Sequence, residues 1–99
     1  MNIVKSVDSQ GIVLSLDGRI DTLSSPQLQT AILQAFQSDK ILTLDFTKVP
    51  YISSAGLRVL LIGQKTATAK GGSLTLCHVS DAVMNVLDMS GFSNILNIV

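Results

Sequence analysis

The stretch that decides the fold runs from residue 41 to residue 79 and reads ILTLDFTKVPYISSAGLRVLLIGQKTATAKGGSLTLCHV. It opens with the apolar run 41–46, which is typical of a buried strand. Apolar side chains then recur at intervals of three and four from residue 54 to about residue 70, so we expect a helix there, ended by the glycine pair 71–72. Residues 74–79 form the next strand, and two strands joined through one helix should be parallel with a right-handed crossover. The residues expected on the inner face of this helix are Leu57, Val59, Leu60, Leu61, Ile62 and Gln64.

Further elements surround this unit on both sides. Residues 2–7 and 12–17 alternate between polar and apolar side chains, and the turn between them predicts a hairpin. Ser25 before Pro26 is typical of a helix start, with the serine as N-cap, and Ser80 is expected to cap a third helix. Residues 95–98 should add a last edge strand. We therefore expect one domain over residues 1–99, of the α/β class, with a mixed β-sheet (β-β-α-β-α-β-α-β) and helices packed mainly on one face.

The composition favours protein partners over nucleic acid or membrane. The net charge is zero and the lysines are scattered, whereas nucleic-acid binding requires clustered positive charge. Charged residues make up only 14% of the chain, so a neutral polar surface can enter an interface with little loss of charge hydration. No apolar run approaches the roughly 18 residues of a membrane span, and the N-terminus does not resemble a signal peptide. These features predict a cytoplasmic protein without direct membrane insertion.

Signatures of catalysis and of cofactor binding do not occur. The sequence contains neither GxxxxGK nor GxGxxG. The single histidine, His78, falls inside a strand pattern and is expected to be structural, and Cys77 is expected to be an inert part of the core. One cysteine and one histidine do not by themselves make a zinc site. Asp17 and Asp21 are interpreted as residues at a strand end and in the following turn, so we expect no enzyme, no metal and no cofactor.

The most informative segment is Tyr51-Ile52-Ser53-Ser54-Ala55-Gly56-Leu57-Arg58. Ser54 is expected to be the N-cap of the central helix, and the small side chains of Ala55 and Gly56 leave its free N–H groups open to another molecule. One interpretation is a plain helix cap. The other is a phosphorylation site, because a phosphate would bring about −1.5 to −2 charges to a helix N-terminus, where anions are stabilised. A partner fitted to the neutral surface would then meet an unpaired charge.

The chain resembles the STAS domain family, and within it the stand-alone anti-sigma factor antagonists of bacteria. The resemblance covers nearly the whole chain. The segments that carry it are Gly18-Arg19-Ile20-Asp21, Leu44-Asp45-Phe46 with Tyr51–Leu57, Lys70-Gly71-Gly72-Ser73-Leu74, and Leu87-Asp88-Met89-Ser90-Gly91-Phe92.

This resemblance implies a partner-switching cycle. The unmodified antagonist would sequester an anti-sigma factor that is also a serine kinase of the GHKL ATPase type, and phosphorylation would release it. A PP2C-type phosphatase would reverse the modification. The phosphoacceptor matches Ser54, with Ser53 as the second candidate, because Ser53 stands where the family often has Asp. The implied partner-binding residues are Asp21, Thr22, Ser53, Ala55, Gly56 and Arg58.

Two other functions remain open at the level of sequence. A STAS-like subunit of a larger assembly, such as a membrane-transport complex, would use Ser54 only as a cap and would not switch. A small-molecule or nucleotide binder would use the same helix mouth, although no base-stacking aromatic is evident there.

Overall fold

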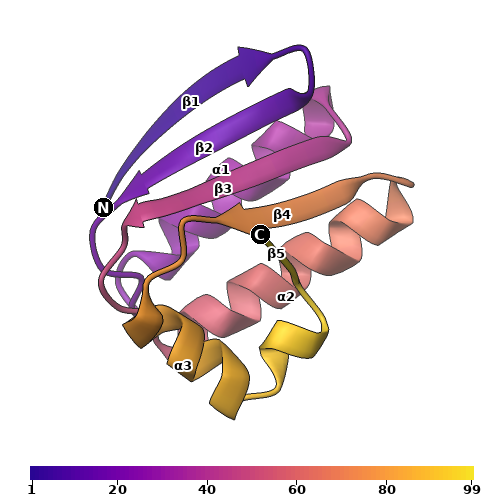
Figure 1. Ribbon diagram of the computed structural model, residues 1–99. Coiled ribbons are helices and arrows are strands. Elements are labelled where there is room, and N and C mark those ends of the chain that lie inside the picture. Colours follow the sequence, from indigo (N-terminus) through magenta and orange to yellow (C-terminus); the bar gives the residue numbers. More distant parts are fainter.

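A five-stranded mixed sheet runs through the computed structural model, which describes residues 1–99 (Figure 1). The spatial order of the strands is β1-β2-β3-β4-β5; β1 and β2 are antiparallel and all other neighbours are parallel. This arrangement confirms the expected fold class and element order. The elements are β1 (Asn2–Asp8), β2 (Gly11–Asp17), α1 (Ser25–Ser38), β3 (Ile41–Lys48), α2 (Ser54–Ala69), β4 (Ser73–Cys77), α3 (Asp81–Met89), the short 3-10 helix η1 (Phe92–Asn94) and β5 (Asn97–Ile98).

The hairpin forms as the turn residues predict. Asp8 pairs with Gly11 across a two-residue loop, and the Asp8 carboxylate accepts a hydrogen bond of 2.7 Å from the Gln10 N–H. Gly11 has a φ of +126°, and a Cβ there would come within 2.5 Å of the Ile41 carbonyl oxygen. Only glycine therefore fits at the point where the hairpin meets β3.

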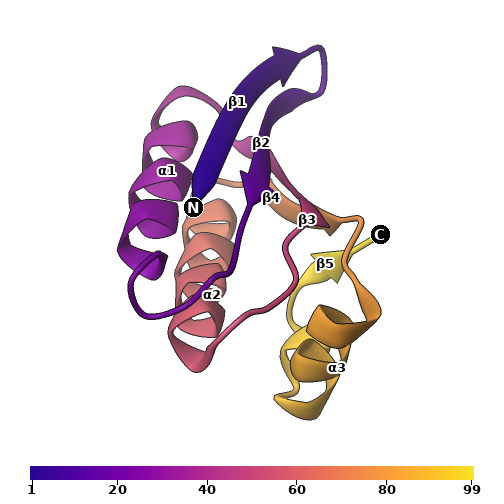
Figure 2. The ribbon, with the colours of Figure 1, turned by 90° about the vertical axis from the view of Figure 1, so that its left-hand side faces the viewer.

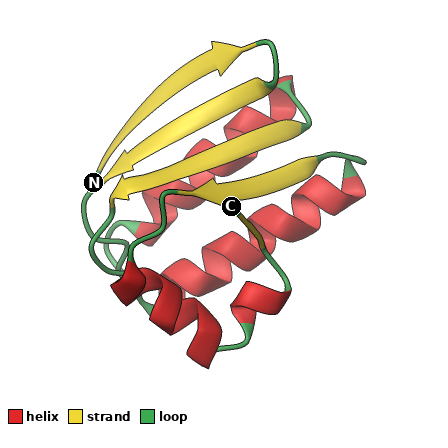
Figure 3. Cartoon of the chain, in the orientation of Figure 1, coloured by secondary structure: helices red, strands yellow, loops and turns green.

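The core lies between the sheet and the helices. Alternate residues of β2, β3 and β4 turn toward α1 and α2, which lie on the same face of the sheet (Figure 2). No helix covers the opposite face (Figure 3), where Thr43, Asp45, Thr75 and Cys77 are half-buried. None of the helices has both the length and the apolar character that a membrane crossing requires.

Several expected boundaries shift in the structure. The helix N-caps are Ser24 and Ser53, one residue earlier than expected, and Ser80 caps α3 as expected. The strand expected over 74–79 ends at Cys77, and the strand expected over 95–98 is reduced to 97–98, because residues 95 and 96 form the turn that follows η1.

The inner face of α2 is also rotated relative to the expected one. Gly63 and Ala67 are buried, whereas Leu61, Ile62 and Gln64 are only half-buried. A Cβ on Gly63 would lie 3.0 Å from Leu74 and 3.3 Å from Ile32. The helix therefore approaches β4 and α1 most closely along its small residues, which a search for large apolar side chains does not detect.

Candidate functional site

Two loops meet at the N-terminus of α2 and form the candidate site. The loop after β2 and the loop before α2 are joined by an isolated parallel bridge between Ile20 and Ile52. The Ile20 N–H donates to the Tyr51 carbonyl at 2.9 Å, and the Ser53 N–H donates to the Ile20 carbonyl at 2.8 Å. Because both isoleucines are buried as well, the backbone on either side of the site is fixed in position.

Gly56 lies beneath this junction rather than on the surface. It is buried, and a Cβ at this position would come within 2.5 Å of Ile20 and 2.7 Å of Ile52. The sequence suggested that Gly56 leaves room for a partner. The structure instead gives it an internal role: its missing side chain lets the two loops sit directly on the first turn of α2.

The two serines at this helix end differ in their surroundings. Ser53 has an extended backbone and is half-buried, and its hydroxyl accepts a hydrogen bond from the Gly56 N–H at 3.4 Å. Ser54 is the first helical residue; it is exposed, and its hydroxyl makes no hydrogen bond within the chain. The expectation that Ser54 is the N-cap is therefore wrong, because Ser54 already has helical geometry and the residue before it provides the cap. The Ser54 hydroxyl is left accessible.

Asp21 stabilises its own loop. Its carboxylate accepts hydrogen bonds of 3.0 Å from the N–H groups of Leu23 and Ser24. The Ser24 amide, together with the Ser24 hydroxyl, the Leu23 amide and the positive charge of Arg19, holds the pKa of Asp21 below its usual value, against the opposing effect of desolvation. No hydrogen bond links Asp21 to Ser53 or Ser54, so in the free chain its carboxylate orders the loop beside the hydroxyl.

The other expected contact residues surround the hydroxyl. Thr22 and Arg58 are exposed, and Ala55 is half-buried. Arg58 follows Ser54 by four residues, so the two side chains share one face of α2. Arg19 stacks on Tyr51 in the loop before α2, with its guanidinium 4.2 Å from the centre of the ring. Two cations, Arg58 and Arg19, therefore flank the site.

Sequence reasoning missed two features of this surface. Leu23 is 91% exposed, although leucine is normally buried. Its position between residues that turn the chain is the signal that could have revealed it, because a leucine there fits neither the strand nor the helix periodicity around it. The stacking of Arg19 on Tyr51 joins residues 32 positions apart and has no local signature.

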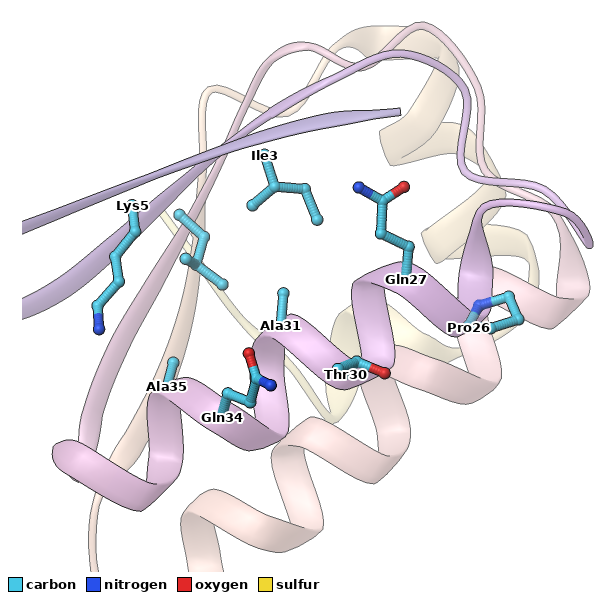
Figure 4. A pocket seen from close by; sticks show the side chains of 9 residues that line it. Ile3, Lys5, Pro26, Gln27, Thr30, Ala31, Gln34 and Ala35 are labelled. Atoms are coloured by element: carbon cyan, nitrogen blue, oxygen red, sulfur yellow. The ribbon is translucent and has the colours of Figure 1, made fainter.

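A separate groove of about 540 Å³ lies between α1 and the β1–β2 hairpin (Figure 4). Its lining mixes apolar side chains such as Ile3 and Ala31 with amides and the amine of Lys5. It contains no carboxylate, histidine or thiol, and we assign it no role.

Comparisons with known proteins agree with this fold. A family model described as the STAS domain matches residues 2–99, so the chain belongs to the STAS domain family. An anti-sigma-B factor antagonist of Listeria monocytogenes is 30% identical over 103 residues, covering 99% of this chain and 90% of the relative. BtrV of Bordetella bronchiseptica, a candidate anti-sigma factor antagonist, is 33% identical over 85 residues, covering 85% of this chain and 73% of BtrV.

Solved structures confirm the expected architecture. The anti-sigma factor antagonist SpoIIAA in its unphosphorylated form superposes with a TM-score of 0.83 at 19% identity, covering 99% of this chain and 88% of that one. The Bacillus SpoIIAA in its phosphorylated form superposes with a TM-score of 0.75, also at 19% identity, covering 99% and 91%. At this level of identity the likeness concerns the fold.

Proposed function

We propose that this chain is an anti-sigma factor antagonist that phosphorylation of Ser54 switches off. The unmodified chain binds an anti-sigma factor that is also a serine kinase of the GHKL ATPase type. The kinase transfers phosphate to Ser54 and releases the chain, and a PP2C-type phosphatase restores it. On this proposal the chain is a cytoplasmic substrate of both enzymes and performs no reaction of its own. Relatives described as anti-sigma factor antagonists support the antagonist role in this proposal.

The accessibility of Ser54 is the observation that carries the proposal. Its hydroxyl is exposed and free of hydrogen bonds, whereas the Ser53 hydroxyl is occupied by the cap of α2. A kinase can therefore reach Ser54 without opening the helix. Ser53 remains the second candidate, but its modification would remove the cap.

The folded chain can carry the phosphate without rearrangement. A phosphoserine at the first residue of α2 adds about −1.5 to −2 charges at the end of the helix where the dipole is positive. Arg58, one turn along the same face, is placed to pair with that charge. We therefore expect phosphorylation to change the surface and leave the fold intact.

The charge decides which partner binds. The exposed Leu23 and the partly exposed Tyr51 give the unmodified surface an apolar component beside Ser54. A partner that buries this surface would have to remove water from the new dianion and from Arg58 beside it, and this desolvation weakens binding unless the partner supplies a further cation. Thr22 and Ala55 complete the proposed contact surface around the hydroxyl.

The test is a kinase assay with the purified chain, ATP and the candidate anti-sigma factor from the same cell. Mass spectrometry should place one phosphate on Ser54, and a PP2C-type phosphatase should remove it. Ser54→Ala should take up no phosphate and stay bound to the kinase, whereas Ser54→Asp should bind at least tenfold more weakly.

Ser53→Ala is the matched control, because it changes the neighbouring hydroxyl and leaves the acceptor in place. It should still be phosphorylated at Ser54. If phosphate were found on Ser53 alone, Ser53 and not Ser54 would be the phosphoacceptor. A stable complex that neither Ser54→Asp nor phosphorylation weakens would overturn the switch and favour a non-switching subunit of a larger assembly.

A further inference from the structure

Three side chains with metal-binding atoms gather away from the phosphorylation site. Asp45 lies near the carboxyl end of β3, Cys77 is the last residue of β4, and His78 follows it. One ligand atom from each lies within 4.8 Å of the other two. The His78 Nδ1 is 3.2 Å from an Asp45 carboxylate oxygen.

Strand register brings Asp45 and Cys77 together. Asp45 and Cys77 are paired residues of neighbouring parallel strands, so their side chains project from the same face of the sheet, the one that no helix covers. Both are half-buried there. The expectation that Cys77 belongs to the apolar core is wrong, because the alternation of β4 turns Leu74 and Leu76 inward and Cys77 outward.

A backbone turn adds the third. His78 is the one non-glycine residue with a positive φ, at 56°. In a continuing strand, residue 78 would face the helices, on the side opposite Cys77. The left-handed conformation ends the strand instead and places the imidazole over Asp45. Such conformations are uncommon and often mark functional positions.

We propose that Asp45, Cys77 and His78 form a binding site for a transition-metal dication, with Zn²⁺ as the ion whose preferences fit best and water as the fourth ligand. Zinc takes thiolate, imidazole and carboxylate ligands in tetrahedral geometry. Thiolate and imidazole ligands disfavour Mg²⁺ and Ca²⁺, which bind oxygen. A thiolate and a carboxylate together also neutralise a dication.

The distance between the nitrogen and the oxygen ligand is close to the one that coordination requires. With zinc–nitrogen and zinc–oxygen bonds of about 2.0–2.2 Å, two such ligands at a tetrahedral centre lie about 3.4 Å apart. The observed 3.2 Å between the His78 and Asp45 atoms is already near this value. The sulfur must approach to about 3.6 Å of both, for a zinc–sulfur bond of about 2.3 Å. Because the His78 side chain is 68% exposed, its ring is free to move toward the Cys77 sulfur.

The carboxylate is also held in place by its own neighbours. Asp45 accepts a hydrogen bond of 2.9 Å from the Thr47 N–H and a second from the Thr47 hydroxyl. Hydrogen bonds of this kind orient metal-ligating carboxylates. Counting one cysteine and one histidine along the sequence misses this site, because the third ligand comes from the adjacent strand.

The test uses the untagged full chain and Co²⁺ as a spectroscopic probe for Zn²⁺. The wild type should bind one Co²⁺ per chain with a thiolate-to-cobalt charge-transfer band, and Zn²⁺ should displace it. Cys77→Ser should abolish the band. His78→Asn and Asp45→Asn should each weaken Co²⁺ binding at least tenfold, whereas Asp88→Asn, which changes an exposed carboxylate at the far end of α3, should leave it unchanged. Asparagine tolerates the left-handed conformation, so His78→Asn should keep the fold, and circular dichroism checks this.

X-ray absorption of the zinc-loaded wild type gives a measurement that needs no variant. It should show one sulfur and otherwise nitrogen or oxygen ligands. The proposal is overturned if no thiolate band forms, if His78→Asn and Asp45→Asn leave the affinity unchanged, or if zinc carries two sulfurs, which would mean a metal shared between the lone cysteines of two chains.

Discussion

Gly56 is the residue on which the geometry of the proposed phosphorylation site depends most directly. In Gly56→Ala the new Cβ would lie within 2.7 Å of both Ile20 and Ile52, so the two loops would have to move off α2. We expect the free energy of unfolding to fall by about 1–3 kcal/mol, as for other overpacked positions. Urea denaturation measures this loss. The matched control is Ser54→Ala at the exposed start of the same helix, which should change stability by less than about 0.5 kcal/mol. Equal stability of the two variants would contradict the close contact.

The lowered pKa of Asp21 should make the stability of the chain depend on pH. The amide of Ser24, with the other hydrogen bonds of the loop, lowers the pKa of Asp21 in the folded chain. A carboxyl whose folded pKa is depressed contributes stability that is fully present above its unfolded pKa and disappears as the pH falls through the folded value. An NMR titration should therefore give Asp21 a pKa below the model-compound value of 3.8. Asp21→Asn should lose stability at neutral pH and differ less from the wild type in strong acid. A normal Asp21 pKa would show that the loop is not ordered as described.

The cap of α2 belongs to the scale of the element. Ser53→Ala removes the hydroxyl that accepts from the Gly56 N–H, and because that bond is long at 3.4 Å we expect a loss of about 0.5–1 kcal/mol. Ser80→Ala removes the corresponding cap of α3, where the bond to the Val83 N–H is 3.2 Å, and provides the comparison. Thermal unfolding of both variants measures the caps. If Ser53→Ala were fully stable while Ser54→Ala were not, the cap would lie at Ser54 as the sequence first suggested.

The elements themselves could largely be predicted from the sequence, because their signals are local. The hairpin turn, the third helix cap at Ser80 and the helix end at Gly71 each depend on a few neighbouring residues. The predicted caps of α1 and α2 lie one residue too late because two consecutive serines stand at the start of each helix, and the sequence does not say which of the two is the cap and which is the first helical residue. The contact face of α2 could not be predicted, since Gly63 contributes to packing because it has no side chain and lets the helix approach its neighbours closely.

The two proposed sites differ in how far the sequence predicts them. Ser54 and its loop carry a local pattern, and the structure places Ser54 at the exposed start of α2. The contact of Asp45 with His78 spans 33 residues and depends on strand register and on one left-handed residue, so no local pattern reports it. The strand pattern indeed favoured an extended His78.

At the scale of the whole molecule, one apolar cluster connects the sheet with all three helices. Leu60 is fully buried in it, and Leu60→Ala should lower the free energy of unfolding by about 2–5 kcal/mol. Far-UV circular dichroism and the fluorescence of Tyr51, the only tyrosine, should give coincident urea transitions in the wild type and the variant. An earlier transition at Tyr51 would mean that the site melts before the rest of the chain.

The bridge between Ile20 and Ile52 has a consequence for the kinetics of the proposed switch. Because both loops are already hydrogen-bonded to each other, a partner that docks there has no chain segment to order and loses little conformational entropy. The association rate with the partner should then be about the same for the unmodified and the phosphorylated chain, apart from the effect of long-range electrostatics. The difference between the unmodified and the phosphorylated chain should appear mainly in how long each complex lasts, that is, in the dissociation rate.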